Sequence, residues 1–329
     1  MSLAVVTGGA GFIGSHTVDL LLGEGFRVHV IDNLTGGRLH NLDQHKGNGN
    51  LAVEVRDIRE IDAGDPLFDG AEYVFHFAGI GDVVPSIERP VDYVSTNTMG
   101  TVRVLEAARR AGVKKLVYAA SSSCYGLADV PTREDAPIRP QYPYALSKFM
   151  GEEAVLHWGR VYQLPVVSIR IFNAYGVRSR TSGAYGAVFG VFLAQKLAGK
   201  PFTIVGDGTQ TRDFLYASDL ARAFFLAAQS DRINEIYNAG AGAPQPVNRL
   251  VELLGGGEAV HLPKRPGEPD CTWADISKIR RDLGWEPRVT FEDGVGRMLK
   301  NIDYWRQAPV WDEQSIAQAT SQWFRYLQK

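Results

Sequence analysis

A glycine-rich loop near the N-terminus, TGGAGFIG (residues 7–14), limits the possible folds of this chain more than any other segment. Gly8, Gly11 and Gly14 recur at every third position, between the apolar run 3–7 and a segment with helical spacing of its apolar residues. A loop of this kind lets backbone N–H groups approach a pyrophosphate, and the dipole of the following helix favours the same negative charge. The loop predicts a dinucleotide-binding unit, although a tight strand-to-helix turn would use glycine in the same way.

Strand-like and helix-like segments alternate after this loop. Strands are expected at 27–31, 51–55, 73–78, 114–121 and 165–172, and helices at 91–112 and 144–163. Such alternation is typical of a parallel sheet covered by helices on both faces. We therefore predict an α/β fold with a Rossmann-type doubly wound parallel sheet.

The alternation breaks after Phe172, where a polar, glycine-rich connection follows. Residues 218–229 are again expected to form a sheet-covering helix, and 235–240 a returning strand. We predict a discontinuous division: residues 1–173 plus about 214–242 form the Rossmann domain, and about 174–213 plus 243–329 form a smaller, mixed C-terminal domain that binds substrate.

Acidic residues follow the second and third expected strands. Asp32 ends the second strand, where its carboxylate can accept hydrogen bonds from both ribose hydroxyls of an adenosine and would repel a 2′-phosphate. This indicates NAD rather than NADP. Asp57 could accept a bond from the adenine amino group or could cap a helix. His76 lies on a strand and is expected to be a core residue rather than a catalyst.

Composition excludes several classes of partner. There are 35 Lys and Arg against 37 Asp and Glu, so nucleic acid is not expected as a partner. The two cysteines, Cys124 and Cys271, lie far apart, which argues against a disulfide framework and favours a reducing cytoplasm. No apolar run approaches the roughly 18 residues of a membrane span, and no metal is expected.

The segment YALSK places Tyr144 and Lys148 one helical turn apart. A phenol loses its proton near pH 10, and a neighbouring ammonium is expected to lower that pKa, which would make Tyr144 a general base. An exposed amphipathic pair would show the same spacing. What favours catalysis is the strand that ends in Ser121–Ser123, because a serine hydroxyl there could share the proton of a substrate hydroxyl with Tyr144.

These segments together resemble the extended short-chain dehydrogenase/reductase family, and within it the NAD-dependent nucleotide-sugar epimerases and dehydratases, closest to the UDP-hexose 4-epimerases. The resemblance runs from residue 7 to about 285. Besides the glycine loop, Asp32 and Asp57, the matching segments are HFAG (76–79), STNTMG (95–100), SSSCYG (121–126), YALSK (144–148), RIFNAYG (170–176), GDGTQTRDFLYASD (206–219) and RPGEP (265–269).

The resemblance implies a role for each matching residue. Tyr144 corresponds to the family's catalytic base, Lys148 to the residue that binds the nicotinamide ribose, and Ser121 to the catalytic serine. Together with Tyr144 and Lys148, the implied NAD contacts are Gly8, Gly11, Phe12, Ile13, Gly14, Asp32, Asn33, Asp57, Ile58, Phe77, Ala78 and Asn97. The implied contacts to a nucleotide-sugar substrate are Ser86, Ser122, Ser123, Asn173, Arg212 and Arg265. A homodimer through helices 91–112 and 144–163 is also implied.

Ser122 and Ser123 bear on the type of reaction. In the family, a 4,6-dehydratase carries Asp–Glu at these positions and a decarboxylase typically carries Ser–Glu. A serine has no usable pKa for removing a carbon-bound proton, so the serine pair favours a 4-epimerase that oxidises C4 and reduces it again. A 4,6-dehydratase or 4-reductase that uses other acids stays open, and so does a non-catalytic NAD-sensing protein on the same fold.

Two segments depart from the family pattern. Residues 177–190 are unusually rich in Arg and Gly, so the family's substrate contacts are not transferred to them. The tail 308–329 extends beyond the usual end of the fold and is expected to cap the smaller domain, with an oligomer contact as the alternative.

Overall fold

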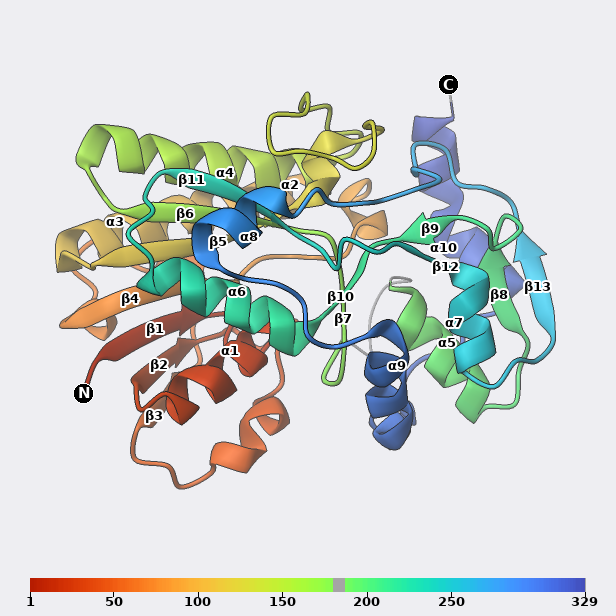
Figure 1. Ribbon diagram of the computed structural model, residues 1–329, viewed down its shortest axis with the longest axis horizontal. Helices are drawn as coiled ribbons and strands as arrows, with labels where there is room; N and C mark the ends of the chain where they lie inside the picture. Colours follow the sequence, from red (N-terminus) through yellow and green to blue (C-terminus); the bar gives the residue numbers. More distant parts are fainter. Residues whose placement is uncertain (180–186, 329) are drawn as a thin grey trace.

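The computed structural model describes residues 1–179 and 187–328, and its centre is a seven-stranded parallel sheet (Figure 1). The strand order is β11-β6-β5-β4-β1-β2-β3. The strands are β1 (Leu3–Thr7), β2 (Arg27–Ile31), β3 (Leu51–Glu54), β4 (Ala71–His76), β5 (Lys115–Ser121), β6 (Val166–Ile171) and β11 (Glu235–Ala239). This confirms the predicted Rossmann-type sheet. Because the order reverses between β1 and β4, a crevice is expected at the carboxyl ends of these two strands.

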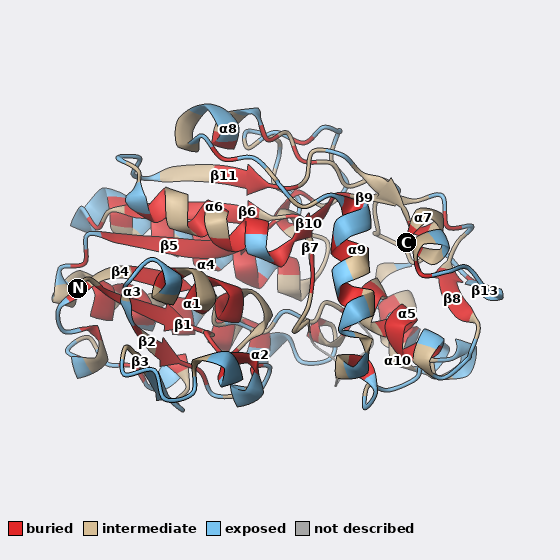
Figure 2. Ribbon diagram, turned by 60° about the horizontal axis from the view of Figure 1, so that its bottom comes forward, coloured by how far each residue is buried: buried red, intermediate tan, exposed pale blue. Residues whose placement is uncertain are grey.

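Helices cover both faces of the sheet. α1 (Phe12–Gly23) packs against α6 (Ala217–Gln229) on one face, and α3 (Thr101–Ala111) packs against α4 (Pro143–Tyr162) on the other. Every residue of β5 is buried, whereas β3 at the sheet edge is largely exposed (Figure 2). A strand covered on both faces has no polar side to present to water, which explains why β5 reads as a continuous apolar run.

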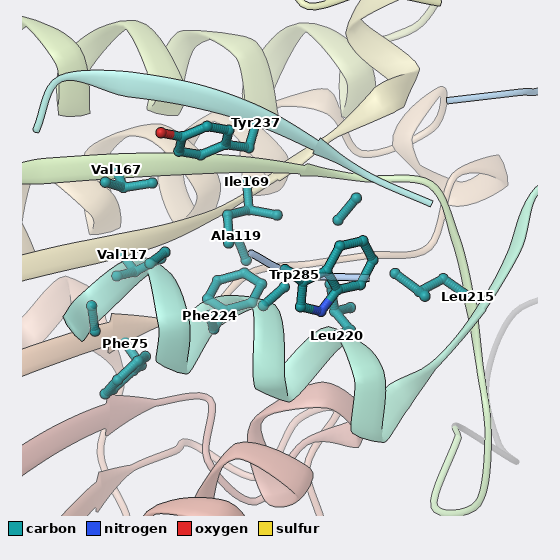
Figure 3. Packing of buried hydrophobic residues seen from close by; sticks show 14 of the residues in the cluster. Phe75, Val117, Ala119, Val167, Ile169, Leu215, Leu220, Phe224, Tyr237 and Trp285 are labelled. Atoms are coloured by element: carbon teal, nitrogen blue, oxygen red, sulfur yellow. The ribbon is translucent and has the colours of Figure 1, made fainter. Parts of the chain in front are cut away.

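The face under α6 holds the largest described hydrophobic cluster. Phe224 and Leu220 of α6 pack there with Val117 and Ile169 of the sheet (Figure 3). Trp285 enters the same cluster from the C-terminal part of the chain, and its indole Nε1 donates a hydrogen bond of 2.9 Å to the Asp219 carbonyl. This indole therefore fastens the C-terminal part of the chain to the helix that covers the sheet.

The single helix expected at 91–112 is interrupted. Its segments are α2 (Pro90–Val94), a π-helical turn at Ser95–Gly100 and α3. In the π-helical turn, the Asn97 side chain bonds to the backbone of Ile80 in a neighbouring loop. The backbone carbonyl of Asn97 accepts a bond from Thr101 Oγ1. Turns of this type occur frequently at functional sites because they widen the helix at one position. Helical residues run from 90 to 111 and end at Gly112, as expected, but the π-helical turn was not expected, because the bonds to Ile80 come from another part of the chain.

Most of the remaining elements form a second group, at the right of Figure 1, whereas α8 (Ser277–Leu283) lies beside the sheet. The second group contains α5 (Val188–Leu197), α7 (Val247–Leu253), α9 (Phe291–Lys300) and α10 (Glu313–Leu327), with the paired strands β8 (Phe202–Val205) and β13 (Ala259–Leu262). Short ladders join β7 (Asn173–Tyr175) to β10 (Phe214–Tyr216) and β9 (Thr211–Arg212) to β12 (Gln245–Pro246), and α8 packs against β11. A separate hydrophobic cluster fills this group, and the C-terminal tail enters it through Ile316 and Trp323. The tail thus caps this cluster, as expected.

Across residues 1–179 and 187–328, no helix combines the length and the apolar character that crossing a membrane requires. The same residues contain no group of three or more His, Cys, Asp or Glu side chains that could hold a metal ion.

Candidate active site

A cavity of about 900 Å³ runs from the glycine loop to the second group of elements. Most of the predicted site residues line it. They are Gly8, Gly11, Phe12, Ile13, Gly14, Asp32, Asn33, Ile58, Phe77, Ala78, Ser121, Ser122, Ser123, Tyr144, Lys148, Asn173, Arg212 and Arg265. The fold therefore brings residues from both halves of the sequence to one site. Part of the Arg- and Gly-rich stretch at 177–190 lies outside the described residues.

The glycine loop at one end of the cavity leaves backbone uncovered. Gly8 has a φ of +70°, and a Cβ atom there would lie 2.7 Å from the Ala78 nitrogen. A Cβ atom on Gly14 would overlap the Gly8 carbonyl oxygen. Only glycine fits at these positions, and the bare turn lies in the cavity wall beside the start of α1. This cradle fits the pyrophosphate of a dinucleotide.

Asp32 lies in the cavity wall at the end of β2 and is only 6% exposed. One carboxylate oxygen accepts a bond of 3.0 Å from the Ala10 nitrogen, and the other accepts a bond of 2.8 Å from the Leu34 nitrogen. A carboxylate has about four acceptor positions, so these bonds leave acceptor capacity for a ribose hydroxyl. Burial raises the pKa of Asp32, while backbone hydrogen bonds oppose that rise. The carboxylate is held ready to recognise NAD, which fits the predicted cofactor.

Asp57 lies beside this end of the cavity but is absent from its described lining. Its carboxylate caps the short 3₁₀ turn η2 (Ile58–Glu60) by accepting a bond from the Arg59 nitrogen, and it also pairs with the Arg59 guanidinium. The Arg59 side chain lowers the pKa of Asp57 to about 2. The capping role is thus present, and the contact to adenine stays a prediction.

The predicted catalytic residues meet at the carboxyl end of β5. Ser121 ends that strand, and Tyr144 and Lys148 project from the first turns of α4, which begins with Pro143 at its first position. The Tyr144 hydroxyl shares a hydrogen bond with the Ser121 side chain. Ser121 Oγ also accepts a bond of 3.2 Å from the Ser123 nitrogen, which fixes the hydroxyl at the start of the turn η6 (Ser122–Tyr125).

The predicted lowering of the tyrosine's pKa by Lys148 was wrong for this arrangement. Burial raises the pKa of Tyr144, and the hydrogen bond from Ser121 opposes that rise only in part. Lys148 is itself buried, and burial lowers its pKa to about 7, with Glu152 acting in the opposite direction. Its ammonium stands over the Tyr118 ring, 4.4 Å from the ring centroid. A lysine whose positive charge is weakened by burial cannot offset the cost of burying a phenolate.

Two other predicted contacts lie behind the cavity wall. Asn97 is fully buried; its amide accepts a bond of 2.8 Å from the Ile80 nitrogen and donates bonds to the Ile80 carbonyl and to Ser147 Oγ. Ser86 is also fully buried and donates a bond of 2.7 Å to the Val83 carbonyl. Neither belongs to the described lining of the cavity, so the geometry favours a supporting role for both over direct contact.

The opposite end of the cavity carries two guanidinium groups. Arg265 Nε lies 3.2 Å from a Glu268 carboxylate oxygen, and Arg212 lies 3.9 Å from the other. Burial lowers the pKa of Arg212, and the charge of Arg265 adds to that effect. Asn173 lies nearby, where its amide oxygen accepts a bond of 2.6 Å from Thr272 Oγ1. Two cations that share one carboxylate keep a net positive charge, which suits the oxygens of a diphosphate.

Sequence reasoning missed part of the cavity wall. Tyr142, Trp311 and Glu268 line it, and none had been assigned to the site. Glu268 could have been assigned to the site from the sequence, because it belongs to the RPGEP segment that resembles the family. Trp311 gave no local signal, since only the tertiary fold brings the tail to the site.

Comparisons with known proteins identify the family of this chain. The family model described as "NAD dependent epimerase/dehydratase family" matches residues 4–240. A protein named putative UDP-glucose 4-epimerase from Methanocaldococcus jannaschii is 36% identical over 305 residues, which cover 90% of this chain and 97% of that protein. A dTDP-glucose 4,6-dehydratase from Streptomyces niveus is 32% identical and is matched over 94% of both chains.

Solved structures extend the likeness to the fold. The crystal structure of UDP-glucose 4-epimerase from Thermotoga maritima, with UDP-glucose, has a TM-score of 0.84 and 34% identity. The match covers 93% of this chain and 99% of that chain. With a cofactor cradle, a serine–tyrosine–lysine group and a family match over residues 4–240, this chain belongs to the NAD dependent epimerase/dehydratase family.

Proposed function

We propose that this protein is an NAD-dependent nucleotide-sugar 4-epimerase that acts on a UDP-hexose or on its uronate or N-acetyl form. One observation carries the proposal: a single cavity holds the Asp32 carboxylate, the Ser121–Tyr144 pair and the Arg212–Arg265 pair. These are the groups that an adenosine ribose, a sugar hydroxyl and a diphosphate need. Relatives named UDP-glucose 4-epimerase and UDP-glucuronate 4-epimerase support the same function.

The residues divide the work as follows. The glycine loop and Asp32 would hold NAD, and the Lys148 side chain would donate to its ribose. When bound, the cofactor would supply the hydride acceptor for C4 of the sugar and the hydride donor for re-reduction. Tyr144 Oη takes the proton of the C4 hydroxyl, shared with Ser121 Oγ, and gives it back on re-reduction. Inversion requires the keto sugar to present its other face, so Arg212 and Arg265 keep the diphosphate bound while the sugar turns.

Incubation of the protein with UDP-glucose, UDP-glucuronate and UDP-N-acetylglucosamine tests the proposal, with NMR detection of the C4 epimer. A non-catalytic NAD-sensing protein would convert none of them. That alternative needs only the glycine loop and Asp32, and it leaves the serine–tyrosine hydrogen bond without a purpose.

The proposed assembly is a homodimer in the cytoplasm. Large apolar side chains are exposed on the helices of residues 90–111 and on α4, which supports a partner at this surface. They are Val91, Met99, Leu146, Met150, Val161 and Tyr162. The division into an NAD-binding and a nucleotide-sugar-binding domain stays a prediction; the separate hydrophobic cluster of α5, α9 and α10 supports it.

Arg212→Ala and Arg265→Ala are each expected to raise KM for the nucleotide sugar about tenfold or more, with a smaller effect on kcat. A hydrogen bond between charged groups is worth roughly 1.5–3 kcal/mol. The diphosphate is remote from C4, so it is bound alike in the ground and transition states. Steady-state kinetics measures both constants. Arg249→Ala, a surface arginine paired with Glu252 and Glu292, serves as the control. An unchanged KM would mean that the arginine is structural.

Lys148→Met is expected to flatten the pH dependence of stability between pH 7 and 9. The lysine's pKa is about 7 in the folded protein against an ordinary value of 10.5, so the unfolded chain binds more protons in this range and stability rises with pH. One proton corresponds to about 1.4 kcal/mol per pH unit at most. Urea denaturation of nucleotide-free protein measures the slope. The exposed Lys300→Met should keep the wild-type slope, and an equal slope in Lys148→Met would contradict the burial of its charge.

A further inference from the structure

The segment that precedes α10 forms part of the cavity wall. Ala308, Pro309 and Trp311 line the cavity. The segment is held in place because Gln195 Nε2 of α5 donates a hydrogen bond of 2.7 Å to the Trp311 carbonyl. The C-terminal tail is therefore more than a cap on the second hydrophobic cluster.

α10 then fixes the loop that carries Arg265. Trp323 of α10 is 1% exposed, and its indole Nε1 donates a hydrogen bond of 2.9 Å to the Pro266 carbonyl. Pro266 directly follows Arg265, and Arg265 lines the cavity. The position of the guanidinium thus depends on an indole in the last helix of the chain.

The same indole packs on the start of α4. The Trp323 and Tyr142 rings lie 5.0 Å apart, and Tyr142 is the N-terminal cap residue of the helix that carries Tyr144. The Tyr142 and Tyr144 rings lie nearly parallel, at 13° and 6.5 Å. Tyr142 also bonds to the Ser123 side chain, and burial raises its pKa to about 12, so it stays protonated and acts as a support rather than a base.

A third part of the wall also rests on α10. The helix packs against the turn η4 (Val84–Ser86), which follows Asp82 and Val83 in the cavity wall. The last helix therefore contacts the Asp82 loop, the start of the catalytic helix and the arginine loop. These three segments otherwise belong to different parts of the fold.

We propose that the tail 308–327 is part of the substrate site. Trp323 is a positioning residue: through Tyr142 it sets Tyr144 against the sugar, and through Pro266 it sets Arg265 against the diphosphate. Trp311 forms the wall beside the bound nucleotide sugar. The inference rests on the proposed function, because it assigns the tail to that same site.

Trp323→Phe and Trp305→Phe form a matched pair. Both indoles are buried in the same hydrophobic cluster, at 1% and 0% exposure, and neither belongs to the described cavity lining. They differ in one bond: Trp323 Nε1 donates to the Pro266 carbonyl, whereas Trp305 Nε1 has no hydrogen-bond partner among the described residues. The measurements are kcat and KM for UDP-glucose, the dissociation constant of UDP by calorimetry, and the NAD content of the denatured protein. Trp323→Phe should weaken UDP binding about fivefold, the effect of one lost hydrogen bond, and lower kcat to a similar extent. Its NAD content should be unchanged, and Trp305→Phe should stay within about twofold of wild type in both constants.

Trp311→Ala provides a second test that does not remove a fully buried side chain. It should raise the UDP dissociation constant about threefold, with NAD content unchanged. If Trp323→Phe does not fold, the UDP affinity of Trp311→Ala alone tests whether the tail belongs to the substrate site. Equal effects in Trp323→Phe and Trp305→Phe, or unchanged UDP affinity in both Trp323→Phe and Trp311→Ala, would overturn the inference and leave the tail as a cap. If wild type converts no UDP-sugar while Trp323→Phe alone loses UDP affinity, the proposed function fails and the positioning role stands.

Discussion

Tyr144→Phe is expected to lower kcat by about 10²–10⁴-fold, the range typical for loss of a general base, while NAD content and substrate affinity stay close to wild type. The substitution removes one buried oxygen, the one that bonds to Ser121. The ring itself stays in place, because it packs edge-on against Tyr93 and nearly parallel to Tyr142. Without that oxygen the proton of the C4 hydroxyl has no acceptor. Single-turnover reduction of bound NAD, followed by absorbance, measures the affected step.

The pH dependence of kcat/KM gives the same residue an independent test. Burial raises the pKa of Tyr144, so the phenol is protonated at neutral pH in the free protein and the base form becomes more abundant as pH rises. Wild-type kcat/KM should therefore increase about tenfold per pH unit until the phenol has lost its proton. In Tyr144→Phe this limb should disappear.

Tyr142→Phe is the control, since its phenol lies in the same cavity wall two positions earlier. It should retain most of the wild-type kcat and the rising limb of the pH profile. A fast Tyr144→Phe enzyme, or a Tyr144→Phe enzyme that keeps the rising limb, would remove Tyr144 from the role of base.

The parts of the fold that sequence could predict are those fixed by local pattern. Strand β5 is apolar because both of its faces are buried. The loop before α1 is rich in glycine because its tight turn has no room for a side chain. The π-helical turn at Ser95–Gly100 was not predictable in this way, because it depends on bonds from Asn97 to Ile80 and Ser147. Such contacts are set only when distant segments meet.

The candidate site shows the same limit. The order and spacing of the sequence motifs were enough to predict that Ser121, Tyr144 and Arg212 belong to one site, and all three line the same cavity. The pKa of Tyr144 was predicted in the wrong direction, because spacing gives the distance to Lys148 along a helix but not the depth of burial that weakens the charge of the lysine. The contacts of Trp323 could not be predicted from the sequence either, because its partners Tyr142 and Pro266 lie far from it along the chain.

The product of UDP-glucose is expected to be its C4 epimer, with no 4-keto-6-deoxy sugar. Elimination of water requires a base at C5 and an acid at C6, and the turn after β5 carries no carboxylate. It offers the hydroxyls of Ser122 and Ser123, and its Tyr125 hydroxyl is engaged with Asn238 and Arg170. Deuterium placed at C4 should be found at C4 of the epimer, because the same hydride is returned to the carbon that it left. A dehydratase would move it to C6. NMR of the product distinguishes the two outcomes, and turnover should need no added NAD once the protein is loaded.

Carboxylates elsewhere in the cavity are the reason to test this outcome. Asp82 and Glu268 both line the cavity, but Glu268 is engaged with Arg212 and Arg265 at the diphosphate end. Asp82 acts on Tyr144, since its negative charge contributes to the raised pKa of the phenol. Asp82→Asn should therefore keep epimerase activity and shift the rising limb of kcat/KM to lower pH, because removing that charge lowers the pKa of Tyr144. Formation of a 4-keto-6-deoxy sugar by wild type, abolished in Asp82→Asn, would instead make Asp82 the missing acid and the protein a dehydratase.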